Sequence, residues 1–157
     1  MAAGSNLVME PADRVLMITR VFDAPLDLVW RAWTDPVELV KWHGPRGFTS
    51  TIEHSDFRPG GKYRIHMLGP EKDDHWLQGT HREIVPMERL SMTSYWADAK
   101  GDPVSPETTL TILFENANGK TKLTMHQAVF ESVGARDGHN TGWNSTLDCL
   151  GEYLAAA

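Results

Sequence analysis

The regular hydrophobic pattern of the chain begins at residue 14, after a polar stretch without periodicity. We therefore expect 1–13 to be a flexible leader and 14–157 to form a single domain. The apolar, β-branched run at 15–22 predicts a strand. Apolar residues then recur at helical spacing over 26–33, and Pro25 suits the first position of that helix because its φ is preset.

A second short helix is predicted directly after the first. Asp35 can cap it, Pro36 fits its first position, and Glu38 follows three residues after the cap, as in a capping box. Gly44-Pro45 and Gly47 are typical of the end of a helix.

The next eighty or so residues read as strands joined by turns. Pro59-Gly60 suits the centre of a type II turn, and Asn118-Gly119 is a tight hairpin signal. Short connections between successive strands favour antiparallel neighbours. Six strands are expected here, at residues 48–57, 61–68, 75–85, 89–97, 108–115 and 121–130.

Helical spacing returns near residue 132. Trp143, Leu147, Leu150 and Leu154 share one apolar face. An adjoining face carries small residues, and its interior glycines cost about 1 kcal/mol each relative to alanine. Either close packing on the sheet or space for a ligand would offset that cost. The small residues are Gly138, Gly142, Ser145 and Cys149.

The order of elements predicts an α+β fold. A curved seven-stranded antiparallel sheet would wrap around the long C-terminal helix, with two short helices after the first strand. A sheet that grips a helix imperfectly leaves a cavity between the two. The sequence therefore favours an internal binding site.

Composition narrows the function without naming it. The 157 residues are 41% hydrophobic, and 15 Lys and Arg against 21 Asp and Glu give a net charge of −6. An acidic surface with scattered basic residues argues against nucleic acid and anionic membranes as partners. Cys149 alone allows no internal disulfide, and no apolar stretch has signal-peptide or membrane-span length. A cytoplasmic protein is expected.

Metal and nucleophile chemistry find little support. None of the seven histidines forms an i, i+4 pair, and His75 and His81 on one strand would lie about 20 Å apart. Neither Ser145 nor Cys149 lies in a nucleophile elbow. No metal and no cofactor are expected.

General acid–base chemistry is an open alternative on the strand at 75–85. Alternation places Gly79, His81, Glu83 and Val85 on one face. If that face is inward, His81 and Glu83 are neighbours in an apolar surrounding that shifts their pKa values, and they become candidate acid and base. The other interpretation is two inward polar groups with structural partners.

The aromatic residues favour ligand binding. Six tryptophans are many for this length, and aromatic and methionine walls suit a flat apolar ligand. Plain core packing is the alternative for each residue. The candidate ligand-binding residues are Trp33, Trp42, His43, Phe48, Tyr63, Ile65, Met67, His81, Glu83, Trp96, Leu110, Ile112, Met125, Trp143 and Leu147.

Several motifs, spread from about residue 15 to 155, carry a family resemblance. They are Phe22-Asp23-Ala24-Pro25, Val29-Trp30-Arg31-Ala32-Trp33-Thr34-Asp35-Pro36, Trp42-His43-Gly44-Pro45, Asp56-Phe57-Arg58-Pro59-Gly60-Gly61-Lys62-Tyr63, Gly79 through Glu83-Ile84-Val85-Pro86, Glu88-Arg89-Leu90, Thr121-Lys122-Leu123-Thr124, and Gly142-Trp143 followed by Leu147, Leu150 and Tyr153-Leu154. The chain resembles the homologues of the activator of heat-shock-protein-90 ATPase, in the SRPBCC (StAR-lipid-transfer-like) helix-grip superfamily. It departs from the family at two positions: His43 stands where the family often has a tryptophan, and Met87 stands where the family often has a proline.

The resemblance implies the fold and several functions. Relatives in the superfamily bind lipids, hormones or polyketides, and some are cyclases, so the fold alone does not choose. The leading hypothesis is that the protein binds a small hydrophobic ligand, which includes aromatic molecules, and has no assigned catalytic activity. One alternative is an enzyme for polyketide-like or related ring substrates that uses His81 and Glu83. The other is a co-chaperone-like module that binds a chaperone protein in a stress response. In each case the protein is expected to be a monomer or a homodimer.

Overall fold

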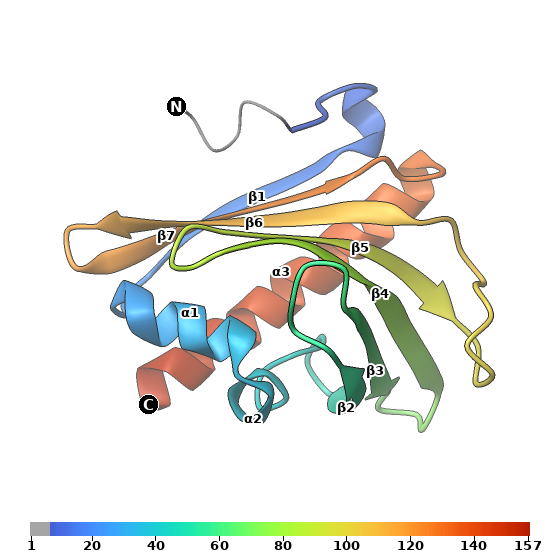
Figure 1. Cartoon of the computed structure of the whole chain (residues 1–157), viewed down its shortest axis with the longest axis horizontal. Helices are drawn as coiled ribbons and strands as arrows, with labels where there is room; N and C mark the ends of the chain where they lie inside the picture. Colours follow the sequence, from blue (N-terminus) through green and yellow to red (C-terminus); the bar gives the residue numbers. More distant parts are fainter. Residues whose placement is uncertain (1–6) are drawn as a thin grey trace.

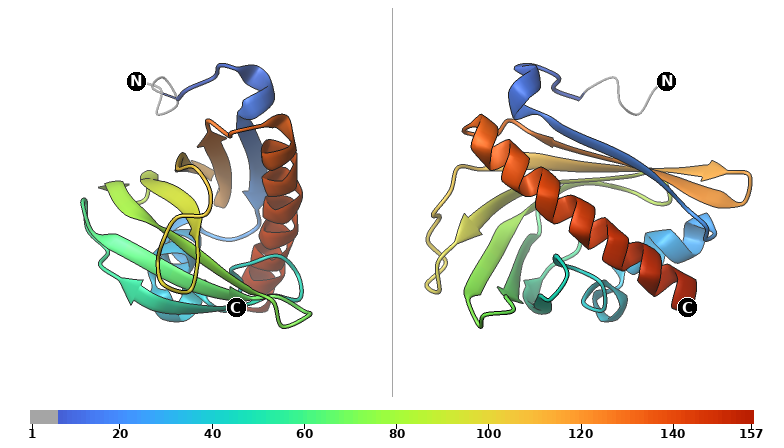
Figure 2. Two further views of the ribbon diagram at one scale, coloured as in Figure 1. Left: turned by 90° about the vertical axis from the view of Figure 1, so that its right-hand side faces the viewer. Right: turned by 180° about the vertical axis from the view of Figure 1, so that it is seen from behind.

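A long helix, α3, runs along the concave side of one curved antiparallel sheet in the computed structural model, which describes residues 7–157 (Figures 1 and 2). The strands are β1 (Leu16–Phe22), β2 (Thr49–Ser55), β3 (Lys62–Leu68), β4 (Asp74–Val85), β5 (Arg89–Ala97), β6 (Thr108–Ala117) and β7 (Lys120–Ala128). The helices are α1 (Leu26–Thr34), α2 (Pro36–Leu39) and α3 (Val133–Ala156), preceded by a 3₁₀ turn, η2 (Ala12–Arg14).

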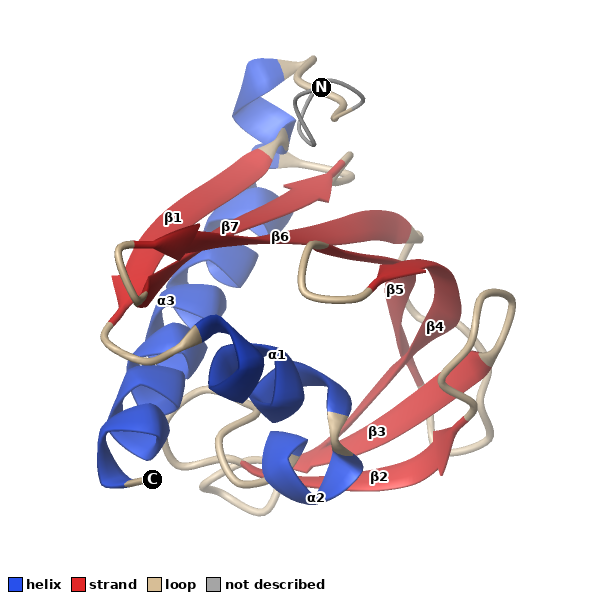
Figure 3. Ribbon diagram, turned by 60° about the vertical axis from the view of Figure 1, so that its left-hand side comes forward, coloured by secondary structure: helices blue, strands red, loops and turns tan. Residues whose placement is uncertain are grey.

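The seven strands are ordered β1-β7-β6-β5-β4-β3-β2, so β1 and β2 are the two edges. Helix α1 lies inside the curve of the sheet (Figure 3). There Trp30 of α1 packs edge to face against Phe114 of β6, with the ring centroids 5.1 Å apart. The predicted α+β helix-grip fold is confirmed.

Two turns have the backbone that their residues demand. Gly60 has φ +85°, as the second central position of a type II turn requires. Asn118 and Gly119 both have positive φ, +55° and +84°, and they join β6 to β7. This pair of angles is typical of a type I′ hairpin, whose twist matches that of the strands.

The predicted caps of the short helices are confirmed only in part. Asp35 accepts a hydrogen bond from the backbone N–H of Val37 at 2.9 Å, and Pro36 is the first residue of α2. The predicted capping box is wrong, because the Glu38 carboxylate accepts a hydrogen bond from the Tyr153 hydroxyl and so ties α2 to α3. Pro25 is the N-cap of α1 rather than its first helical residue.

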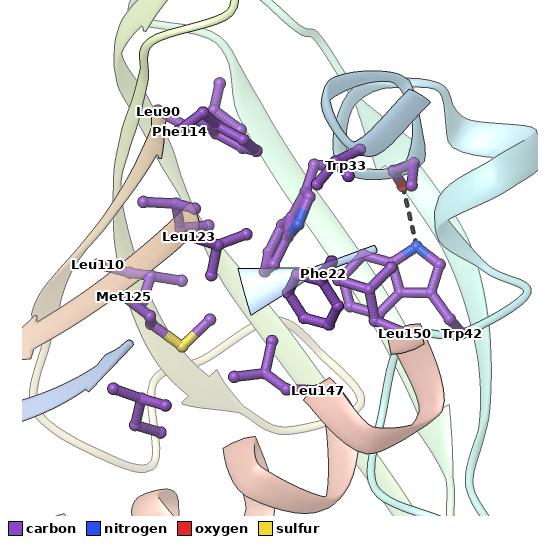
Figure 4. Packing of buried hydrophobic residues seen from close by; sticks show 14 of the residues in the cluster. Phe22, Trp33, Trp42, Leu90, Leu110, Phe114, Leu123, Met125, Leu147 and Leu150 are labelled. Carbon is purple, nitrogen blue, oxygen red and sulfur yellow. Dashed lines mark hydrogen bonds between the residues drawn. The ribbon is translucent and has the colours of Figure 1, made fainter. Parts of the chain in front are cut away.

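Residues of the sheet, α1 and α3 pack together as the hydrophobic core (Figure 4). Leu147, Leu150 and Leu154 of α3 are buried there, as the spacing predicts, and each contributes about 1.5–3 kcal/mol. The Trp42 indole donates to the carbonyl of Ala32 at 3.0 Å, which fixes the loop after α2 against α1. No helix within residues 7–157 is both long and apolar enough to cross a bilayer.

Part of the predicted leader, residues 1–6, lies outside the described residues. Within its described part, the carbonyl of Val8 accepts a hydrogen bond from His126 Nε2 of β7 at 2.6 Å. Arg136 of α3 donates to the carbonyls of Ala12 and Val15, at 3.4 and 3.1 Å. Contacts with the domain therefore begin before residue 14.

Candidate ligand-binding cavity

A cavity of about 380 Å³, here called the outer chamber, lies between the first half of α3 and strands β3 to β5. Aromatic, apolar and small residues make up most of its wall. The lining residues are His43, Gly44, Pro45 and Phe48 from the loop after α2; Met67, His75, Leu77, Ser94, Trp96 and Gln127 from the sheet; and Ala135, Gly138, His139, Gly142, Trp143 and Thr146 from α3.

A smaller cavity of about 70 Å³, the inner chamber, adjoins it. His43, Leu77 and Trp143 line both chambers and so form the partition between them. The inner chamber extends beneath α1 and α2. Its other lining residues are Trp33, Thr34, Pro36, Leu39, Ile52, Ser55, Phe57, Tyr63, Ile65, His81, Leu90, Met92 and Leu110.

The small residues of α3 leave space at the outer chamber. A Cβ atom at Gly138 would meet no described atom of another element within 4 Å, and a Cβ at Gly142 would meet only Pro45 at 3.8 Å. Both glycines line the outer chamber, and neither position is closely packed against the sheet. Ser145 has another task, because its Oγ accepts the Arg46 backbone N–H at 2.9 Å and holds the loop to the helix.

A chain of hydrogen bonds holds Trp143 in place. Its indole N–H donates to Gln127 Oε1 at 2.9 Å, and Gln127 Nε2 donates to Thr108 Oγ1 at 2.9 Å. Thr108 Oγ1 then donates to the carbonyl of Ser94 at 3.2 Å. Because each buried polar group has a partner, this part of the wall presents mainly apolar surface to the chamber.

His43, at the partition between the two chambers, is neutral: its Nδ1 donates a hydrogen bond and its Nε2 is free to accept one. The Ser50 hydroxyl donates its one proton to the His43 carbonyl at 2.9 Å, so it must accept from His43 Nδ1, 3.0 Å away. That contact fixes the proton on Nδ1 and leaves a lone pair on Nε2. Burial lowers the pKa of His43 to about 4, which keeps the ring neutral at pH 7.

The predicted pairing of His81 with Glu83 is wrong. The register between β4 and β5 shifts between these two residues, so the alternation of side chains reverses there. His81 is buried and lines the inner chamber, whereas the Glu83 side chain is 51% exposed. Glu83 accepts a hydrogen bond from Arg89 Nε at 2.9 Å on the outside of the sheet.

Tyr63, another of the candidate ligand-binding residues, is buried and lines the inner chamber. Its hydroxyl donates to the carbonyl of Thr93 at 2.6 Å, and burial raises its pKa. The hydroxyl is therefore protonated and committed to the sheet. What Tyr63 offers the inner chamber is its ring.

Comparison with known proteins places the chain in a family. The family model for activator of Hsp90 ATPase homolog 1-like proteins matches residues 23–155. The chain belongs to this family. This match confirms the resemblance that the sequence motifs predict. No curated protein matches the chain.

Solved bacterial structures share the fold. A Chromobacterium violaceum protein is 28% identical, with a TM-score of 0.80 over 90% of this chain and 96% of that one. A Nitrosomonas europaea protein is 30% identical, with a TM-score of 0.76 over 92% and 96% of the two chains. An Arthrobacter aurescens protein is 26% identical, with a TM-score of 0.85 over 98% and 92%.

The structure brings ten of the sequence candidates to the two chambers and leaves five elsewhere. Those at a chamber are Trp33, His43, Phe48, Tyr63, Ile65, Met67, His81, Trp96, Leu110 and Trp143. Trp42, Ile112, Met125 and Leu147 belong to the core, and Glu83 lies outside. Ile112 and Met125 are direct partners across β6 and β7, and both are fully buried in the core.

Some lining residues were missed. His75 and Leu77 share the inward face of β4 with Gly79 and His81, so the same alternation carried toward the start of the strand would have found them. Gln127 and His139 had no comparable signal, because their position depends on how α3 crosses the sheet. No group of three or more His, Cys, Asp or Glu side chains in residues 7–157 is arranged to hold a metal ion.

Proposed function

We propose that this protein binds one small, largely apolar molecule between α3 and the sheet. The observation that carries the proposal is the outer chamber, an open space of about 380 Å³ within the range of about 300–1,000 Å³ common for ligand sites. Gly138 and Gly142 border it in a helix where alanine would be more stable, which suits a space kept for a ligand.

The wall suits a flat ring. Trp96, Trp143 and Phe48 offer aromatic surfaces, and Met67 offers a side chain that adapts to irregular shapes. Each 100 Å² of apolar ligand surface removed from water contributes about 2.5 kcal/mol. His43 supplies a polar group at the inner end, so an apolar ring with one polar substituent fits best.

The two alternative functions fare differently. The acid–base enzyme required His81 and Glu83 side by side, but the register shift in β4 turns Glu83 to the outer surface of the sheet, away from His81. Binding of a chaperone protein stays a prediction that family membership suggests. A pull-down with the middle domain of the chaperone tests it, and absence of binding would remove it. Cytoplasmic location and the oligomeric state also stay predictions.

The test of the proposal is a thermal-shift screen with neutral ring compounds, 2-naphthol among them. A ligand at 100 times its Kd stabilises the native state by about 2.7 kcal/mol, which corresponds to roughly 5–10 °C in Tm for a chain of this size. Quenching of tryptophan fluorescence should follow the same concentration dependence. The proposal is wrong if none of the ring compounds raises Tm at millimolar concentration.

A further inference from the structure

Two residues that line the inner chamber each carry a buried nitrogen atom without a hydrogen-bond partner. Within residues 7–157, Trp33 Nε1 and His81 Nε2 are the buried side-chain polar atoms without a hydrogen bond. Each residue is only 7% exposed, and both line the inner chamber. Buried polar groups in native proteins nearly always have partners, so two exceptions at one cavity call for an explanation.

Other indoles of this chain show what a partnered one looks like. The Trp42 N–H donates to the Ala32 carbonyl at 3.0 Å, and the Trp143 N–H donates to Gln127 at 2.9 Å. Trp33 packs against both of these rings, at centroid distances of 4.6 and 6.3 Å. Because an indole N–H only donates, neither of these two rings offers an acceptor to the N–H of Trp33.

The surroundings of His81 offer it no partner either. Its ring packs edge to face against Phe57, with ring centroids 5.1 Å apart, and against Tyr63, with ring centroids 5.3 Å apart. The Tyr63 hydroxyl is committed to the Thr93 carbonyl. Burial lowers the pKa of His81, against the opposing effect of Asp56, so the ring does not present a fixed positive charge.

We propose that the bound molecule places a neutral oxygen, a hydroxyl or a carbonyl, in the inner chamber, where it accepts the indole N–H of Trp33 beside Nε2 of His81. This inference rests on the proposed function and adds the functional group to it. An indole nitrogen only donates, so the incoming atom must be an acceptor. A space of about 70 Å³ admits one small group, which keeps the apolar ring in the outer chamber.

The same wall disfavours an anion. Among the described residues that line the inner chamber there is neither lysine nor arginine. A carboxylate would lose its hydration without gaining a counter-charge, which is far more costly than burying a hydroxyl that is hydrogen-bonded. An ammonium group would lack an acidic partner and would face a donor. A neutral oxygen is the substituent that these groups can satisfy.

The test compares three ligands of similar shape: 2-naphthol, 2-methylnaphthalene and 2-naphthoate. Calorimetry on the full chain should show 2-naphthol binding at least tenfold more tightly than 2-methylnaphthalene, with 2-naphthoate weaker than 2-naphthol. Trp33→Phe keeps the ring and removes the N–H, and it should reduce the preference for 2-naphthol about tenfold, the equivalent of 1.4 kcal/mol. His81→Leu should reduce it in the same direction.

Trp42→Phe is the matched control, because it removes a buried indole N–H that borders neither chamber. It should leave the preference within about twofold of the original. If Trp33→Phe does not fold, the three-ligand comparison and His81→Leu decide the outcome. Equal affinity for 2-naphthol and 2-methylnaphthalene, or a preference unchanged in both variants, overturns the inference while leaving ligand binding intact. If neither neutral ligand binds, the proposed function fails as well.

Discussion

The indole N–H of Trp143 on α3 donates to Gln127 Oε1 on β7 at 2.9 Å, and this bond joins the terminal helix to the sheet beside the outer chamber. Gln127 is almost completely buried, and its Nε2 in turn donates a hydrogen bond to Thr108 Oγ1. The bond therefore has two roles: it fixes the orientation of an aromatic wall, and it satisfies polar groups that could not otherwise be buried.

Gln127→Met should lower the free energy of unfolding by about 1–3 kcal/mol, because it leaves the Trp143 N–H without its acceptor. Urea denaturation measures the change. The double variant with Trp143→Phe should cost less than the sum of the two single variants, since each removes the same bond. Strictly additive costs would show that the bond contributes nothing to stability.

Gly142→Leu should abolish ligand binding without loss of stability. The new side chain would extend beside the outer chamber from a position whose Cβ meets only Pro45 at 3.8 Å, and leucine favours the helix by about 1 kcal/mol over glycine. Thr141→Leu is the control, because Thr141 is exposed and borders neither chamber. Calorimetry with 2-naphthol measures both. Undiminished binding in Gly142→Leu would place the ligand elsewhere.

His43 should make the protein less stable in acid. Its pKa is about 4 in the folded state against 6.5 unfolded, so between these values the unfolded chain binds the proton and the native chain does not. The free energy of unfolding should therefore fall as pH drops from 7 to 4, by up to about 3 kcal/mol from this group.

Urea titrations across that pH range measure the slope. His43→Asn keeps a donor for Ser50 and should flatten it, whereas the exposed His54→Asn should keep the contribution of His43. His81, whose pKa burial also lowers, contributes in the same direction and accounts for part of the slope that persists. A profile that is identical in both variants would contradict the buried neutral state of His43.

Glu83→Gln should leave ligand affinity unchanged and stability within about 0.5–1 kcal/mol, because its contact with Arg89 is on the outer surface of the sheet. His81→Leu, two residues earlier, should change ligand preference. Calorimetry with 2-naphthol on the two variants tests the bulge directly. An effect of Glu83→Gln on binding would mean that the register shift does not turn this carboxylate away from the chamber.

Local chemistry made much of the fold predictable. Positive φ at Gly60, Asn118 and Gly119 follows from residues that tolerate that conformation, and the strands between the turns follow from alternation. The buried face of α3 follows from spacing alone, as Leu147, Leu150 and Leu154 show. Each of these properties depends on residues that are near one another in the chain.

The residues of the binding cavity were harder to predict from such local patterns. One shift in pairing between His81 and Glu83 reversed the faces of β4, and nothing in the alternating pattern marks where a strand bulges. Met125 and Trp96 are both apolar strand residues, yet Met125 is buried in the core and Trp96 borders a cavity. Which of the two occurs depends on how the helices pack on the sheet at each point.

By itself, the sequence determined the order of elements, their turns, the family and the presence of a helix with one bulky and one small face, because these follow from local preferences. Only the tertiary structure decided where the space lies and which polar atoms border it. Trp33 and His81 come from α1 and from β4, far apart in the sequence, and they line one chamber because the two short helices pack inside the curve of the sheet. That arrangement is a property of packing between elements, which no single segment encodes.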